Sequence, residues 1–189
     1  MAAYKLIFAQ YKVFPTEQEI ARHFGDWEAP KYFGIQDVSG CFDKIDAHAE
    51  AALKKVALYP GAHAVLKSLK DSKRLALLTS SLREVIDAAI KHNRLAEYFE
   101  VVLAGEDVQN HKPHPEVIEK GLAKLSGTKP EAVMIGDSRK DLEAASNAGV
   151  DSILVYPKSH KLFYNLAELK AYKPTYIVSS LTQILNILK

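Results

Sequence analysis

Five short apolar runs, separated by segments with helical periodicity, fill the chain from residue 75 to its end. The runs are LALLT at 75–79, VVLAG at 101–105, AVMIG at 132–136, SILVY at 152–156 and YIVS at 176–179. Each is apolar at consecutive positions, which is typical of a strand buried on both faces. The segments between them, such as SLREVIDAAIKHN and HPEVIEKGLAKLS, have the apolar spacing of helices. This alternation predicts a parallel sheet covered by helices.

The first 58 residues have a different pattern. Apolar and aromatic side chains recur at helical spacing at Tyr4, Ile7, Phe8 and Tyr11. Thr16 is a candidate N-cap for a second helix, and the segment DAHAEAALKKV is rich in alanine, the strongest helix former. We therefore expect a small helical module over 1–58 and an α/β domain over 59–189, with the boundary at LYPG.

The charges of the chain are balanced, with 25 Lys and Arg against 23 Asp and Glu. They form no long runs, so nothing indicates binding to nucleic acid or to an anionic membrane surface. The single cysteine, Cys41, excludes an internal disulfide and fits a reducing compartment. No apolar run approaches the ~20 residues that span a bilayer. We expect a cytoplasmic protein that binds neither nucleic acid nor membranes, and the oligomeric state stays open.

The segment GDSRKDLEAASNAG places Asp137 and Asp141 where the run AVMIG gives way to a helix. Ligands of an open parallel sheet collect at the carboxyl ends of its strands. Two carboxylates about one helical turn apart can face one point, as oxygen ligands of a hard cation such as Mg²⁺ must. A purely structural explanation is also open, in which Asp137 or Ser138 caps the helix and Asp141 stabilises its positive end.

Two further groups are expected at the same edge of the sheet. The run LALLT ends at Thr79, followed by Ser80 and Ser81, and a hydroxyl with backbone N–H groups at a helix start can bind phosphate. Ser81 and Glu84 have the spacing of a capping box. Lys112 lies in HKPHP, where two prolines stiffen the backbone around its positive charge. Taken singly, the hydroxyls are better explained as an ordinary helix start and Lys112 as a surface lysine.

The order of these groups resembles the haloacid dehalogenase-like hydrolase superfamily. A hydroxyl follows one strand, a lysine in KPHP comes about thirty residues later, and GDSRKD follows about twenty-five residues after that. The resemblance runs from about Tyr59 to the carboxyl terminus and implies a Rossmann-like three-layer α/β/α domain with a parallel sheet. Residues 1–58 are similar to the family's small helical cap. Four aromatic residues either line the substrate site or form the core of this module: Phe24, Trp27, Tyr32 and Phe33.

The resemblance also implies roles for the motif residues. Thr79 and Lys112 correspond to catalytic residues that, with Ser80, hold the transferring phosphoryl group, and Asp137 and Asp141 correspond to the acidic pair that binds Mg²⁺. These roles imply a Mg²⁺-dependent phosphatase of a small phosphorylated metabolite, similar to phosphoglycolate phosphatases. A dehalogenase or phosphonate-cleaving relative is an alternative, although the acidic pair favours metal-dependent phosphoryl transfer.

One part of the family pattern is missing. The family's first motif, DxDx(T/V), follows an initial apolar strand, and its two aspartates act as nucleophile and as general acid and base. The strand-like candidate in this chain is KLIFAQYKVF, which puts Ala9 and Tyr11 at the positions of the aspartates. Neither side chain can act as a carboxylate nucleophile or proton carrier.

Two accounts of residues 1–14 are therefore open. In the first, the segment is already the first cap helix, and the initial strand is absent from this chain. In the second, the segment is the first strand, and the protein is an inactive relative that binds a ligand or a partner. By resemblance the first strand lies between the strands that end at Thr79 and Gly136, so its loss costs ~1–3 kcal/mol for each unpaired backbone group. We expect a chain that is inactive by itself and that is unstable or recruits a strand, with KLIFA as one candidate.

Overall fold

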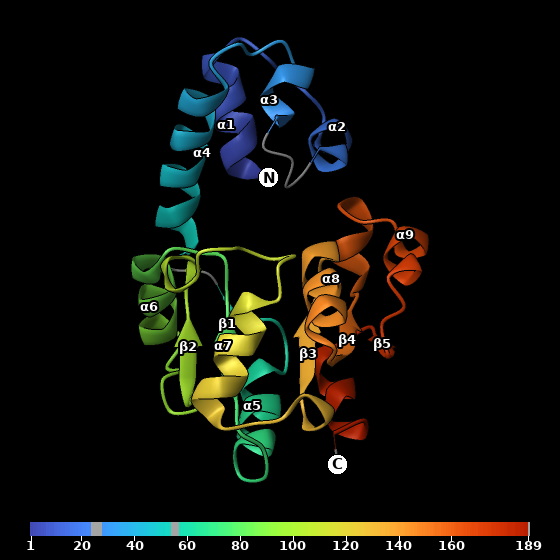
Figure 1. Ribbon diagram of the computed structural model, residues 1–189. Coiled ribbons are helices and arrows are strands. Elements are labelled where there is room, and N and C mark those ends of the chain that lie inside the picture. Colours follow the sequence, from blue (N-terminus) through green and yellow to red (C-terminus); the bar gives the residue numbers. More distant parts are fainter. Residues whose placement is uncertain (24–27, 54–56, 189) are drawn as a thin grey trace.

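The computed structural model describes residues 1–23, 28–53 and 57–188. Four helices form a module that lies beyond one end of an α/β unit (Figure 1). The expected boundary at residue 58 falls in the connection between the last helix of the module and the first helix of the α/β unit. Within the described ranges, no helix is both long and apolar enough to cross a lipid bilayer.

The module consists of α1 (Ala2–Gln10), α2 (Glu17–Arg22), α3 (Ala29–Tyr32) and α4 (Val38–Leu53). Its core is formed mainly by Ile7, Phe8, Ile20, Cys41, Phe42 and Ile45. The predicted cap at Thr16 is confirmed, because its hydroxyl accepts a hydrogen bond from the Glu19 N–H. The Glu19 carboxylate in turn accepts from the Thr16 N–H, which completes a capping box.

The segment KLIFA lies in helix α1, not in a strand. Ala9 belongs to the last turn of this helix, and Tyr11 is its C-cap, with a hydroxyl that donates to Asp37 Oδ2 at 2.9 Å. The account in which this segment is the first strand of the sheet is therefore wrong. Its apolar side chains at Ile7 and Phe8 are buried in the module, which explains why the helical period prevails over the strand-like composition.

The aromatic residues that we expected in the module have different environments. Phe33 packs against Phe8, with ring centroids 5.2 Å apart, and so belongs to the core. Tyr32 is exposed and stacks on His23. Phe24 and Trp27 lie outside the described residues.

All five predicted strands are present in the α/β unit: β1 (Ala76–Leu78), β2 (Val101–Leu103), β3 (Val133–Gly136), β4 (Asp151–Val155) and β5 (Tyr176–Val178). Its α-helices are α5 (Ala62–Lys70), α6 (Arg83–His92), α7 (Glu116–Leu125), α8 (Arg139–Ala148) and α9 (Leu166–Ala171). Short 3₁₀ helices are η1 (Gly105–Asp107), η2 (Lys129–Glu131), η3 (Lys158–Leu162) and η4 (Leu181–Asn186). The segment near the end of the chain is thus a 3₁₀ helix, η4, and not an α-helix.

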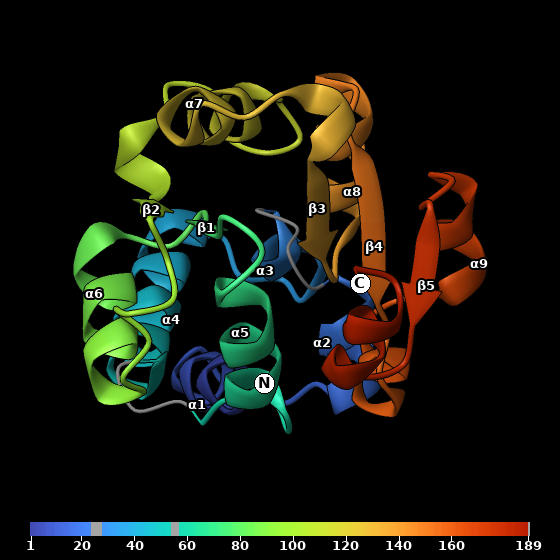
Figure 2. The same cartoon turned by 90° about the horizontal axis from the view of Figure 1, so that it is seen from below.

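The strands lie between two layers of helices, as Figure 2 shows from below. Helices α7 and α8 pack on one face of the strands, through side chains such as Val117 and Ala145. On the other face α5 packs with η4, and Val65, Leu69 and Ile184 meet Ile153 of β4. The unit is therefore a three-layer α/β/α sandwich, as expected.

The sheet itself is interrupted. Strand β1 pairs in parallel with β2, and β3, β4 and β5 form a second parallel sheet in that order. Within the described residues, no backbone pairing joins β1 to β3. The predicted parallel pairing is therefore present in two half-sheets, with β1 and β3 as the inner strands on either side of the gap where the missing first strand was expected (Figure 2).

Candidate anion and metal site

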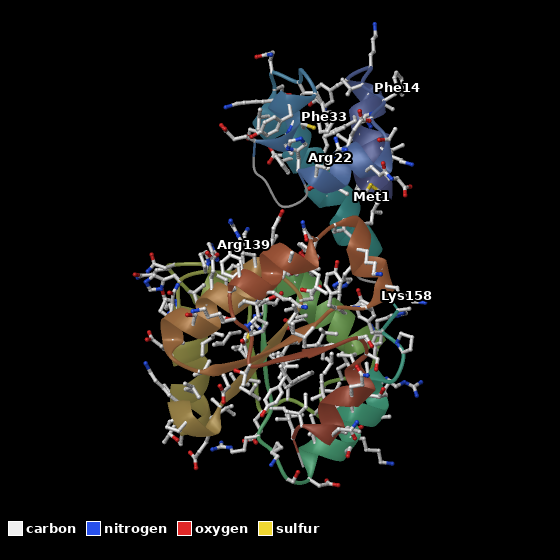
Figure 3. All side chains as sticks on the ribbon, turned by 90° about the vertical axis from the view of Figure 1, so that its right-hand side faces the viewer. Met1, Phe14, Arg22, Phe33, Arg139 and Lys158 are labelled. Carbon is white, nitrogen blue, oxygen red and sulfur yellow. The ribbon has the colours of Figure 1, made fainter. Side chains whose placement is uncertain are left out.

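The predicted site residues come from loops that follow β1, β2 and β3. Figure 3 shows Arg139, at the start of α8, on the end of the α/β unit that faces the helical module. Asp137 and Ser138 link β3 to this helix. A side chain on Gly136 would collide with Cβ of Asp141, so the glycine allows α8 to begin close to the strand.

Thr79 directly follows β1 and is half-buried. Its hydroxyl accepts a hydrogen bond from the Ser81 N–H at 3.0 Å, and its own N–H donates to Leu103 O of β2. Ser80 is exposed at the same loop. The chain therefore turns sharply after the strand and leaves two hydroxyl groups, of Thr79 and Ser80, near its carboxyl end.

The predicted capping box of Ser81 and Glu84 is wrong. Helix α6 begins later, at Arg83, and its N-cap residue, Leu82, provides no side-chain cap. The Glu106 carboxylate accepts the Arg83 N–H instead, at 2.9 Å to each oxygen. A residue that is distant in the sequence thus accepts the free N–H at the start of the helix. The spacing of residues within the segment 81–84 could not indicate this contact.

Lys112 reaches from the loop before α7 to the end of β1 and to the first turn of α8. Its Nζ donates to Asp141 Oδ1 at 2.7 Å and to the backbone oxygen of Leu78 at 3.4 Å. The side chains of Lys112 and Asp141 are only 11% and 9% exposed. The lysine therefore forms a largely buried ion pair that connects the end of β1 with the start of α8.

Asp141 has a structural role as well as this ion pair. Ser138 is the N-cap of α8, and its hydroxyl donates to Asp141 Oδ2 at 2.7 Å, while the Asp141 N–H closes the capping box. The capping explanation is therefore correct for Ser138. Burial raises the pKa of Asp141, but the Lys112 charge and the hydrogen bonds from Lys112 and Ser138 have the larger combined effect and lower it.

Asp137 has the opposite electrostatic environment. Its side chain is 51% exposed, and its carboxylate lies 3.7 Å from His160 Nε2. Burial of the carboxyl raises its pKa, and the negative charge of Asp141 raises it further. The two aspartates thus differ, because Asp141 is neutralised by a lysine, whereas Asp137 has no lysine or arginine within 4 Å among the described residues.

Sequence reasoning missed the surroundings of Asp137. His160 is 5% exposed, its Nε2 lies 2.8 Å from the Tyr59 hydroxyl, and three tyrosine rings pack edge-on around it: Tyr59, Tyr156 and Tyr164. Burial, together with the charges of Asp137 and Asp141, raises the pKa of Tyr164 to about 12. His160 follows β4, so the rule that functional groups collect at the carboxyl ends of strands could have indicated it.

The arrangement provides a cation, two carboxylates and hydroxyl groups at one edge of the strands. In the described part of the chain, no three His, Cys, Asp or Glu side chains cluster as a complete metal site. Mg²⁺ is commonly bound by one or two carboxylates together with water and substrate phosphate. The half-exposed carboxylate of Asp137 fits such a ligand set, with Asp141 beside it in the same turn.

Comparison with known proteins gives a consistent family assignment. The sequence model described as haloacid dehalogenase-like hydrolase matches residues 1–155. Pyrophosphatase PpaX of Halalkalibacterium halodurans is 33% identical over 135 residues, which are 71% of this chain and 61% of that protein. Pyrophosphatase PpaX of Bacillus mycoides is 31% identical over 119 residues, 63% of this chain and 54% of that protein. The chain therefore spans little more than half the length of these curated relatives.

Solved structures share the fold. A putative phosphoglycolate phosphatase from Lactobacillus plantarum superimposes with a TM-score of 0.82 at 20% identity, over 98% of this chain and 89% of that chain. A haloacid dehalogenase-like family hydrolase from Streptococcus pneumoniae gives a TM-score of 0.84 at 20% identity, over 100% and 89%. At this identity the likeness concerns the fold.

Replacement by asparagine should have different effects on stability at Asp141 and at Asp137. Asp141→Asn leaves Lys112 without its buried partner, and we expect it to lower the free energy of unfolding at pH 7 by about 3–5 kcal/mol. Asp137→Asn removes a carboxylate whose charge the fold disfavours and should leave stability equal or higher. Because the pKa of Asp141 is lowered in the fold, its contribution is present above its ordinary value of 3.8 and is lost as pH falls below it.

Urea denaturation of both variants between pH 3 and pH 7 measures these effects. The deficit of Asp141→Asn should narrow below about pH 4. Equal destabilisation by both variants at pH 7 would contradict the electrostatic assignment.

Proposed function

Since the chain belongs to the haloacid dehalogenase-like hydrolase family, we propose that its site binds the phosphoryl group of a small phosphorylated metabolite together with Mg²⁺. The observation that supports this most strongly is the ion pair of Lys112 and Asp141, which lies beside Asp137 at the carboxyl ends of β1 and β3. The names of the relatives, pyrophosphatase and putative phosphoglycolate phosphatase, favour a phosphorylated substrate. The proposed reaction type, once an attacking carboxylate is supplied from outside the described residues, is therefore that of a phosphatase.

Lys112 is the residue best placed to bind the phosphoryl oxygens. An ammonium group has three donors, and here one is directed at Asp141 and one, at 3.4 Å, at Leu78 O. The third donor is available to a ligand at the mouth of the site. The hydroxyl groups of Thr79 and Ser80 follow the same strand end and would complete the binding of the equatorial oxygens.

Asp137, with Asp141 beside it, would hold Mg²⁺. When bound, this ion supplies positive charge to the phosphoryl oxygens and helps to neutralise the charge of the transition state. It would also offset the repulsion between the two carboxylates that raises the pKa of Asp137. Asp141 also keeps Lys112 in position through its ion pair, and would therefore contribute to binding of the phosphoryl group as well as of Mg²⁺.

The attacking carboxylate is the part that the described residues do not supply. Ala9 and Tyr11, which occupy the expected positions in the sequence, lie at the end of α1 in the helical module. Asp141 is committed to Lys112 and to the cap of α8. We therefore propose that the chain by itself binds the phosphoryl group without hydrolysing its ester.

Phosphate binding tests this function directly. We expect Lys112→Gln to weaken binding of inorganic phosphate in the presence of Mg²⁺ at least about tenfold, as measured by isothermal titration calorimetry, because a charged hydrogen bond is lost. Lys140→Gln is the matched control, since Lys140 is exposed in the first turn of α8. Equal weakening by both substitutions, with both variants folded, would show that phosphate responds to net charge and not to the site.

A second candidate function is that of a non-catalytic protein that binds a phosphorylated ligand or a partner. The position of Ala9 and Tyr11 in a helix favours it, because no strand of the described chain brings a nucleophile to Lys112. We expect no hydrolysis of p-nitrophenyl phosphate above background with Mg²⁺. Robust turnover that Asp137→Ala abolishes would mean that the chain has a nucleophile that we have not identified.

A further inference from the structure

The gap between the two half-sheets contains a large apolar cavity. Its volume is about 670 Å³, on the order of twenty times the ~30 Å³ that one water molecule occupies in the liquid. Exposed residues such as Lys73, Arg74 and Glu131 also line this cavity, so it opens to solvent. Both inner strands line it, through Ala76–Leu78 of β1 and Val133–Ile135 of β3. We call this cavity the strand slot.

Within the described residues, the backbone of β1 presents groups that have no strand partner to the strand slot. Leu75 O accepts from Glu100 N–H and Thr79 N–H donates to Leu103 O, so the backbone groups of these alternate residues face β2. The groups of Ala76 and Leu78 therefore face the opposite side, where the gap lies. Lys112 confirms this direction, because its Nζ reaches Leu78 O from that side at 3.4 Å. In a buried strand, such groups are normally paired.

The same argument applies to β3. Tyr156 N–H donates to Val178 O, so the backbone of Tyr156 faces β5, and that of Ile153, three residues earlier, faces β3. In a parallel ladder only one residue of each directly opposed pair points toward its partner strand. Because Ile135 is opposite Ile153, the backbone groups of Ile135 and of Val133 point into the strand slot.

The two faces of the strand slot are covered by helices. Ile118 and Leu122 of α7 line one side, and Leu69 of α5 and Leu188 lie on the other. All four side chains are apolar, so an occupant would be buried on both faces. A strand in such a position carries a continuous apolar run rather than an alternating pattern.

Other occupants fit less well. A small apolar ligand cannot pair the backbone groups of both strands, and a helix, about 10–12 Å wide, has its own backbone groups already paired. A second copy of the chain offers no strand, because each apolar run of its described α/β unit already lies in a half-sheet. The run KLIFA is helical, with Ile7 and Phe8 buried in the module.

We propose that the strand slot is a binding site for one extended polypeptide strand that is not among the described residues. The strand lies parallel to β1 and β3, pairs with both, and carries an apolar run of about four residues, the length of β3. Its carboxyl end lies level with Thr79 and Asp137, beside Lys112. The proposal rests on backbone pairing, so it does not depend on the phosphate chemistry of the site.

A synthetic peptide tests this proposal on the full chain. The probe is acetyl-KKVIVIAGK-amide, whose apolar run fits a strand buried on both faces and whose lysines keep it soluble. Its control is acetyl-KKVPVIAGK-amide, because proline removes an N–H donor and is not tolerated inside a central strand. We expect calorimetric binding of the first peptide with a 1:1 ratio, binding of the proline peptide at least about 100-fold weaker, and a rise in Tm of about 5 °C or more at saturation.

Variants of the chain locate the binding. Ala76→Pro removes a donor that faces the strand slot and should weaken peptide binding at least about tenfold. Ile177→Pro is the matched control on the outer edge of β5: the Val178 pairing shows that Ile177 faces away from β4. This variant should bind the peptide within about twofold of the wild type.

Three outcomes would overturn the proposal. One is the absence of binding by the VIVI peptide, and another is equal binding of both peptides, which indicates nonspecific apolar contact. The third is a dimer, seen by light scattering, that excludes the peptide, which would mean that a second copy occupies the strand slot. Since the two peptides are compared on the wild-type chain, a failure of Ala76→Pro to fold leaves the test intact.

Discussion

A buried strand must pair its backbone groups on both sides, and this constraint governs the α/β unit. Among the residues that the structure describes, strands β1 and β3 pair on one side only, to β2 and to β4. The consequence is visible in burial: Ala76–Leu78 are only half-buried, whereas Ile153 and Leu154 of the fully flanked strand β4 are completely buried. The gap therefore exists because β1 and β3 of the described chain do not pair with each other. Helices α5 and α7 cover its two faces.

The site depends on the same gap. Lys112 pairs with Asp141 and contacts Leu78 O, and so connects β1 with α8, the helix that follows β3, at the end where the phosphoryl group would bind. Tyr59 and His160 form a second connection, from the segment before α5 to η3, which follows β4. The site residues are thus held in place although the sheet between them is interrupted, which is consistent with the proposed binding of a phosphoryl group without turnover.

Sequence patterns predicted the elements well where the determinants are local. Consecutive apolar residues identified all five strands, and Thr16 identified the start of α2. Both features are determined by the types of a few neighbouring residues. Contacts between distant segments were not predictable: Glu106 replaces Ser81 at the start of α6, and His160 reaches Asp137. The division of the sheet was inferred from a missing motif and not from any residue present in the chain.

Residue-resolved hydrogen exchange of the native chain tests the central claim most directly, because it reports pairing of individual amides. The account predicts that the Leu78 and Ile135 amides, which face the gap, exchange much faster than the Thr79 amide, which is bonded to Leu103 O, and the Ile153 amide of β4. Protection of Leu78 and Ile135 equal to that of Ile153 would show that the two half-sheets form one continuous sheet and would contradict the account.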